Sequence, residues 1–224
     1  MVGTWNSLLS FPPSTAKVHP QDNKTNAVMK ITACIWLVVI LTAMVMIANF
    51  TSTPGLAREA PAQWPAQSKI SLDNSRPTLI MFAHPHCPCT QASVGELEEL
   101  MAYCQGRINA HVVFIEPSGT AKDWVETDLW RRASAIPGVQ IHEDAMCVEA
   151  SLFKAETSGF TVLYDTKGTL QFAGGITIAR GHMGDNPGLS TIEKTVTQGL
   201  PHYAKTPVFG CSLFGTECRP EDAR

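Results

Sequence analysis

One apolar run dominates the hydrophobic pattern of the chain, at residues 31–50, and it contains no charged residue. A helix needs about 20 apolar residues to cross the hydrocarbon core of a bilayer. The run is therefore predicted to be a transmembrane signal-anchor helix. Lys17, Lys24 and Lys30 precede it, so the positive-inside rule makes residues 1–30 a cytosolic tail and places the rest of the chain outside.

A second interpretation of the same run remains open. Translation beginning at Met29 rather than Met1 would turn residues 31–50 into the apolar part of a secretory signal. The run is long for a cleavable signal, and no clear A-x-A site follows it directly. An uncleaved anchor is therefore favoured, although the sequence does not settle the start residue or cleavage.

Short apolar runs alternate with segments of helical spacing after this point. Residues 51–76 are rich in Pro and Ala and are predicted to be an extended linker. Strands are predicted at 77–83, 111–115, 139–142, 160–164 and 170–172, and helices at 90–104, 120–135, 144–155 and 190–198. Alternation that ends in a hairpin predicts an α/β domain over residues 77–200, a mixed sheet flanked by helices. A C-terminal extension, 201–224, carries two cysteines.

Length and charge restrict the function classes. The chain has 224 residues, which leaves enough for one ordinary domain after the tail, span and linker. Its formal net charge is −3 and it has no basic cluster. Nucleic acid is therefore excluded as an expected partner, and the membrane is expected to be contacted through residues 31–50.

The candidate chemistry lies at Cys87-Pro88-Cys89, between a predicted strand and a predicted helix. The thiolate is the reactive form of cysteine. The free N–H groups and positive dipole end of a helix N-terminus lower a nearby thiol pKa. Two thiols at such a turn are typical of dithiol chemistry.

The other exported cysteines have less informative surroundings. Cys104 falls on the apolar face of the predicted helix and is expected to be a buried core residue. Cys147 lies in the first turn of another predicted helix, which would lower its pKa; a buried core residue is the favoured interpretation, and both stay open. Cys211 and Cys218 flank a Gly-containing loop and are candidates to close it. Disulfide pairing cannot be derived from sequence, so all four stay open.

These residues carry a family resemblance. The stretch His-Pro-His-Cys-Pro-Cys-Thr at 84–90, with the strand before it, the helix after it and the hairpin at 160–175, resembles thioredoxin-fold proteins. Within them it is most similar to the membrane-tethered extracytoplasmic group and its bacterial RedB-like proteins. The resemblance implies a thioredoxin-like fold, redox-active cysteines, and protein thiols and disulfides as partners. It also implies a single-pass protein of the bacterial cytoplasmic membrane, with its C-terminal domain in the periplasm or an equivalent compartment.

The resemblance also assigns roles to individual residues. Cys87, expected to be the more exposed thiol, would attack a substrate disulfide, and Cys89 would resolve the mixed disulfide. His86 is a candidate to tune the Cys87 thiolate. The expected substrate-binding residues come from the hairpin and nearby loops, and they are Gly159, Phe160, Gly174, Gly175 and His182. No cofactor is required by this chemistry.

Two departures from the family pattern bear on these roles. A single residue, Pro88, separates the cysteines, where thioredoxins have two. A bridge across one residue closes a smaller, strained ring and is predicted to be comparatively oxidising. Where the fold normally has a cis-proline before the hairpin, this chain has Ser158-Gly159. Backbone docking of a substrate at that loop is therefore a weaker expectation.

A different function class is kept open by the histidines near the cysteines. Together, Cys87, Cys89, His84 and His86 offer sulfur and imidazole ligands that suit copper or zinc, with His182 as a distant fifth ligand. Copper chaperones of the Sco type use the same fold for metal delivery. An inert thioredoxin-fold interaction module is a third interpretation. Substrate, electron donor, redox direction and oligomeric state cannot be read from the sequence.

Overall fold

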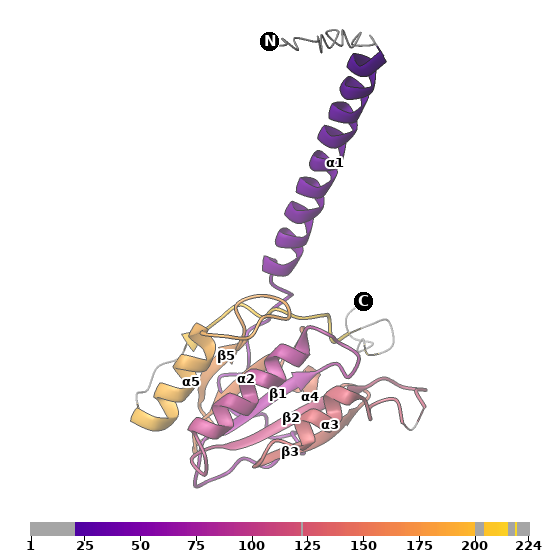
Figure 1. Cartoon of the computed structure of the whole chain (residues 1–224). Helices are drawn as coiled ribbons and strands as arrows, with labels where there is room; N and C mark the ends of the chain where they lie inside the picture. Colours follow the sequence, from indigo (N-terminus) through magenta and orange to yellow (C-terminus); the bar gives the residue numbers. More distant parts are fainter. Residues whose placement is uncertain (1–20, 122, 200–203, 215–217, 219–224) are drawn as a thin grey trace, which may run out of the picture. The chain divides into compact units, whose positions relative to one another are not determined.

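The computed structural model describes residues 21–121, 123–199, 204–214 and 218. The chain divides into two compact units, Met1–Met46 and Ile47–Arg224, and each is described by itself. The first contains most of one long helix, and the second contains a sheet with its flanking helices (Figure 1).

Helix α1 (Gln21–Ser52) contains the apolar run and extends it at its N-terminal end. The helix includes residues 21–30, predicted as tail, because this stretch contains no Gly or Pro to end it. Its Lys24–Ser52 part is long and apolar enough to cross a membrane. The apolar side chains of this part are exposed on all sides, as Trp36 and Val38 illustrate. A helix that is apolar all round is a candidate membrane span.

The second unit is built on a mixed sheet. The described strands have the order β3-β2-β1-β4-β5-β6. Their bounds are β1 (Thr78–Ala83), β2 (Asn109–Glu116), β3 (Val139–Ala145), β4 (Phe160–Tyr164), β5 (Leu170–Gly174) and β6 (Ala204–Lys205). Strand β1 pairs in parallel with β2 and antiparallel with β4, and β4 and β5 form the expected hairpin. This is the predicted thioredoxin-like α/β arrangement.

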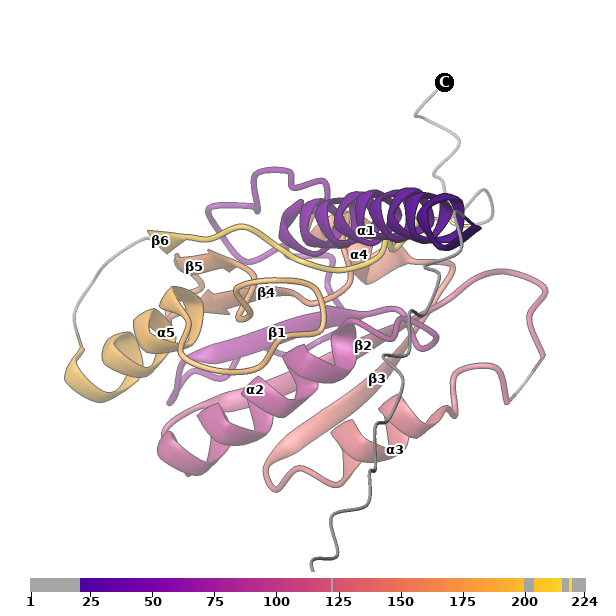
Figure 2. The same cartoon turned by 45° about the horizontal axis from the view of Figure 1, so that its top comes forward.

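Helices cover both faces of the sheet (Figure 2). One face carries α2 (Thr90–Tyr103), α3 (Asp128–Ser134) and α5 (Pro187–Gln198), and the other carries α4 (Val148–Leu152). The central strand β1 supplies both cores: Leu79 and Met81 face the first, and Ile80 and Phe82 face the second. A strand buried on both faces is apolar without alternation, which explains the continuous run in its sequence.

The helix predicted over 120–135 is mostly wrong, because α3 begins only at Asp128. Thr127 sets this start: its side-chain oxygen accepts a hydrogen bond from the Trp130 N–H, and its hydroxyl donates to the Pro85 carbonyl. Helix α5 begins three residues before the predicted start, because Asn186 caps it and Pro187 suits its first turn.

The segment predicted as a linker packs on the domain. The Trp64 N–H donates to the Gly168 carbonyl at 2.8 Å, and the Leu170 N–H donates to the Ala62 carbonyl at 3.0 Å. The Trp64 ring packs edge-on against Phe153 and Tyr164. These contacts join residues from about 60 onward to the folded unit, whereas composition alone placed the boundary at 77.

Candidate active site

The two motif cysteines lie in a tight turn between β1 and α2, as predicted. The Cys87 N–H donates to the His84 carbonyl at 3.0 Å, and the Thr90 N–H donates to the Cys87 carbonyl at 3.2 Å. Cys89 is the N-cap residue of α2. Cys87 is only 3% exposed whereas Cys89 is partly exposed, so the expectation that Cys87 is the more exposed thiol is wrong.

A third cysteine completes the site. The sulfur atoms of Cys87 and Cys211 are 2.8 Å apart, although 124 positions separate the residues in the chain. The three sulfur atoms of Cys87, Cys89 and Cys211 all lie within 4.8 Å of one another. The sequence did not predict that Cys211 joins the motif cysteines, because no short-range pattern links residues that are 124 positions apart.

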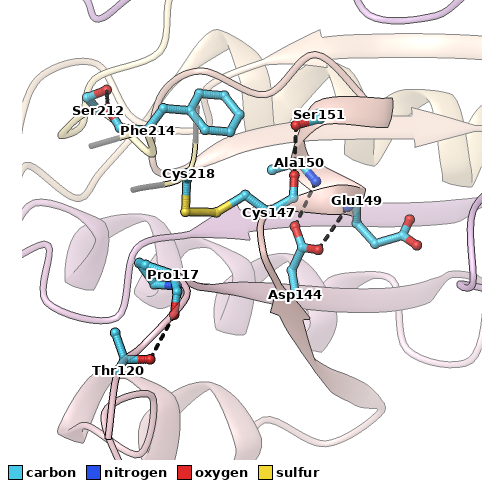
Figure 3. Close-up of a disulfide and its surroundings, with 10 residues drawn as sticks. All are labelled: Pro117, Thr120, Asp144, Cys147, Glu149, Ala150, Ser151, Ser212, Phe214 and Cys218. Carbon is cyan, nitrogen blue, oxygen red and sulfur yellow. Dashed lines mark hydrogen bonds between the residues drawn. A yellow bond between two sulfur atoms is a disulfide. The ribbon is translucent and has the colours of Figure 1, made fainter. Parts of the chain in front are cut away.

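Cys218 is bonded to Cys147, so the expected Cys211–Cys218 loop is corrected (Figure 3). Cys147 lies at the start of α4, whose first N–H groups are capped by Asp144. The Asp144 carboxylate accepts from the N–H groups of Glu149 and Ala150, each at 2.8 Å (Figure 3). The disulfide ties the chain just beyond Cys211 to this anchored helix.

Residues 204–214 form a segment that we call the C-terminal strap. The Thr206 N–H donates to the Ala173 carbonyl on β5, and the strap then follows the loop at 156–158. There the Ser158 N–H donates to the Cys211 carbonyl at 2.8 Å, and the Leu213 N–H donates to the Glu156 carbonyl at 2.9 Å. The strap thus pairs antiparallel with the loop that precedes β4.

The strap occupies the surface where glycines were expected to leave room for substrate. A Cβ atom at Gly175 would lie 2.6 Å from the Pro207 carbonyl oxygen, and one at Gly174 would meet Thr206. Gly159 has a φ of +89°, a backbone conformation that favours glycine. Its N–H donates to the Phe82 carbonyl at 2.7 Å. The next residue, Phe160, is a predicted substrate-binding residue, and the structure buries it in the second core.

The three candidate histidines do not join the sulfur cluster. His86 places its Nε2 atom 3.0 Å from the Trp124 carbonyl oxygen, and its ring lies against the Trp124 ring. The His84 ring packs edge-on against the same tryptophan. Burial, and secondly the neighbouring His86, lower the pKa of His84, which favours its neutral form. His182 is exposed, with Nδ1 at 2.9 Å from the Arg180 carbonyl oxygen.

Opposing effects act on the Cys87 thiol, and the pKa is lowered on balance. Burial raises it most strongly, but hydrogen bonds from the Cys211 thiol and from the Thr90 hydroxyl and N–H favour the thiolate. Burial and the bond to Cys87 raise the pKa of Cys211 to about 12. Burial and the Cys87 charge also raise the pKa of Cys89. Cys87 is therefore the first of the three to ionise.

Ser158 stands at the place where the fold normally has a cis-proline, and no cis peptide occurs in the described residues. Its Oγ atom accepts from the His84 N–H at 2.8 Å and lies 2.6 Å from the Thr90 Oγ1 atom. Since the Thr90 hydroxyl donates to the Cys87 sulfur, Ser158 donates to Thr90. This hydroxyl chain fixes the loop and stabilises the thiolate. The sequence indicated neither role for Thr90 or Ser158.

Replacing Thr90 by valine is expected to raise the pKa of Cys87, because a methyl group replaces the hydroxyl donor at nearly constant volume. The thiolate absorbance in the ultraviolet, followed during a pH titration, should show its first step at higher pH than in the wild type. Thr90→Ser is the matched control and should restore the wild-type step. Superimposable wild-type and Thr90→Val titrations would remove Thr90 from this role.

Comparison with known proteins agrees with the observed fold. No protein-family model matches the chain. The thiol:disulfide interchange protein TxlA homolog of Synechocystis sp. is 31% identical over 99 residues, 44% of this chain. The match spans 53% of that relative, about half of its length.

Two solved structures that are similar to this chain each have a TM-score above 0.5 with it. An uncharacterized conserved protein from Geobacillus kaustophilus superimposes with a TM-score of 0.54 over 74% of this chain and 94% of its own, at 17% identity. A hypothetical protein from Sinorhizobium meliloti gives 0.53 over 72% and 93%, also at 17% identity. At this identity the likeness shows the fold alone.

Proposed function

We propose that this chain is a membrane-anchored, extracytoplasmic thiol-disulfide oxidoreductase in which Cys87 is the nucleophile and Cys89 resolves the intermediate. The observation that carries the proposal is the sulfur cluster at the start of α2, in which the pKa of Cys87 is lowered while the pKa values of its two neighbours are raised. Similarity to a relative named as a thiol:disulfide interchange protein supports the same chemistry.

The exchange proceeds in two displacements. The Cys87 thiolate attacks one sulfur of a protein disulfide, the substrate S–S bond breaks, and the second substrate sulfur leaves as a thiolate that takes up a proton. Cys89 then loses its proton and attacks the Cys87 sulfur, which releases the first substrate thiol and leaves a Cys87–Cys89 bridge. The substrate gains two electrons and the pair loses two. The reverse sequence oxidises a dithiol, and relative potential decides the direction.

The compartment and the membrane attachment belong to the proposal as well. Helix α1 has the length and composition of a span, and lysines precede its apolar part. Disulfides persist in oxidising compartments, so the Cys147–Cys218 bridge supports a domain on the periplasmic side of a bacterial membrane. The RedB-like resemblance, the tuning role of His86 and docking of substrate near Gly159 and His182 remain predictions.

Copper or zinc binding is less well supported than exchange. The expected imidazole ligands contact Trp124 and the Arg180 carbonyl, which leaves three thiols as the donor set. Two thiolates on one tetrahedral zinc ion, at about 2.3 Å each, lie about 3.8 Å apart. The 2.8 Å between the Cys87 and Cys211 sulfur atoms is nearer to a bond than to that spacing.

Turnover tests the proposed function. The full chain in detergent micelles, supplied with a dithiol reductant and a peptide that contains one disulfide, is expected to accelerate reduction of the peptide over many cycles. The measurement is the rate of appearance of free peptide thiol, compared with the reductant alone. A rate equal to that of the reductant alone, with protein whose fold is intact, would reject the oxidoreductase.

A further inference from the structure

We propose that Cys211 is a third redox-active cysteine: the C-terminal strap occupies the docking position of a substrate, and Cys87 forms a reversible disulfide with Cys211 that exchanges with the Cys87–Cys89 bridge. The proposal rests on the proposed function and adds a residue from the C-terminal segment to it. The strap then acts as a substrate supplied by the chain itself.

The strap is held at the site by backbone pairing. An extended peptide docks on an exposed edge by main-chain hydrogen bonds. The strap does this at the loop before β4, where Ser158 donates to the Cys211 carbonyl and Leu213 donates to the Glu156 carbonyl. The residue that pairs with Ser158 is the cysteine itself. Backbone docking therefore brings its sulfur to Cys87, as it would bring the sulfur of an incoming polypeptide.

The fit of the strap at this point is specific. A Cβ atom at Gly210 would overlap the Ser158 carbonyl oxygen, so only glycine allows this approach before Cys211. The Arg180 guanidinium donates to the Gly210 carbonyl and holds the other side of the strap. Sulfur atoms in a disulfide are about 2.0 Å apart, so closing the 2.8 Å gap needs a movement of less than about 1 Å.

Both ends of the strap are fastened, which keeps the Cys211 thiol at the site. Strand β6 pairs with β5 on the N-terminal side, and Cys218 is bonded to Cys147 on the C-terminal side. Because the strap is fastened on both sides of Cys211, the effective concentration of the Cys211 thiol at Cys87 is high. By contrast, the buried Cys104 lies in the first core, away from this cluster.

The exchange within the chain needs no outside electron acceptor. Cys211 loses its proton and its thiolate attacks the Cys87 sulfur of a Cys87–Cys89 bridge. The bond to Cys89 breaks, and Cys89 leaves as a thiolate that takes up the proton. One S–S bond replaces another, so the oxidation state of the chain is unchanged. A substrate disulfide supplies the original oxidation by accepting two electrons, as in the proposed function.

The test uses the full-chain variant Cys89→Ser, which removes the first partner of Cys87. The reduced variant, with the Cys147–Cys218 bridge verified intact, is equilibrated in buffers of reduced and oxidised glutathione, quenched with acid and mapped by peptide mass. The expected result is a Cys87–Cys211 disulfide that appears and disappears reversibly with the buffer ratio. Cys89→Ser with Cys104→Ala is the matched control and should form the same bridge.

Cys87 carrying only glutathione, with Cys211 free in every buffer, would overturn the role of Cys211. A wild-type chain that still forms Cys87–Cys89 in those buffers would leave the proposed function standing. If wild-type Cys87 forms no disulfide at all, both proposals fail. In Cys89→Ser with Cys211→Ser, the proposal predicts the loss of the bridge and accumulation of the glutathione adduct on Cys87.

Discussion

Replacing Cys87 by serine is expected to lower turnover of the disulfide peptide by on the order of 10³-fold or more, because a hydroxyl oxygen cannot form the mixed disulfide. The neighbouring thiols are poor substitutes. The pKa of Cys211 is raised to about 12 and that of Cys89 is raised too, so little of either is thiolate at neutral pH. The measurement is the initial rate of peptide thiol release.

The matched control for this variant is Cys104→Ala, which removes a thiol that is fully buried in the first core. It should keep the wild-type rate, provided that circular dichroism shows a folded domain. A Cys87→Ser variant that retained the wild-type rate would show that another thiol is the nucleophile. The assignment of Cys87 would then be wrong even if the chain were an oxidoreductase.

Removing the Cys147–Cys218 disulfide is expected to cost about 4 kcal/mol of unfolding free energy, since the bridge closes a loop of 71 residues in the unfolded chain. Cys147 is fully buried and Cys218 is only 4% exposed, so alanine at both positions avoids leaving polar groups in the core. The double variant Cys147→Ala with Cys218→Ala should unfold at a lower denaturant concentration than the wild type. The fluorescence of the partly buried Trp64, Trp124 and Trp130 can report the transition.

The same double variant should also loosen the strap. Freed at its C-terminal end, the strap is expected to leave the loop more often, so Cys211 should react faster with a thiol reagent. Peptide-resolved labelling measures this rate, and Cys104→Ala serves again as a control with the bridge intact. An unchanged unfolding midpoint together with an unchanged labelling rate would show that the bridge neither stabilises the fold nor holds the strap.

Local patterns were enough to predict the frame of this fold. The run before Cys87 is apolar because β1 is buried on both faces, and the helical spacing after Cys89 follows the face that α2 packs on the first core. These signals depend on neighbours within a few positions, so they can be read from the sequence. The hairpin at β4 and β5 was predictable for the same reason.

The composition of the site depends on contacts that no local pattern encodes. Cys211 reaches Cys87 only because the strap pairs with the 156–158 loop, more than 50 positions earlier in the chain. An earlier part of the strap, at Pro207 and Val208, lies against Gly175. Cys87 is 3% exposed, so the expectation that it is the more exposed thiol of the motif is wrong. The choice of Cys147 as partner for Cys218 likewise follows from tertiary packing around α4.

The orientation of individual side chains was also not predictable from the sequence. The His86 ring lies against the Trp124 ring, 38 positions later in the chain, and nothing in the local sequence indicates this contact. Thr90 and Ser158 carry no signal of their own, because hydroxyl residues are common at helix starts and in loops. Their role follows only from the 2.6 Å contact between them across the site.

The central claim is that Cys87 cycles between thiolate and disulfide, and a redox titration of the wild-type chain tests it most directly. The full chain is equilibrated in glutathione buffers spanning roughly −270 to −120 mV, the range of known dithiol enzymes. Thiol tagging resolved by peptide then follows Cys87. Reversible, two-electron formation of a disulfide at Cys87 is expected within this range. A Cys87 that stays reduced throughout, and that is tagged only after a chelator is added, would contradict it and make metal binding the function to pursue.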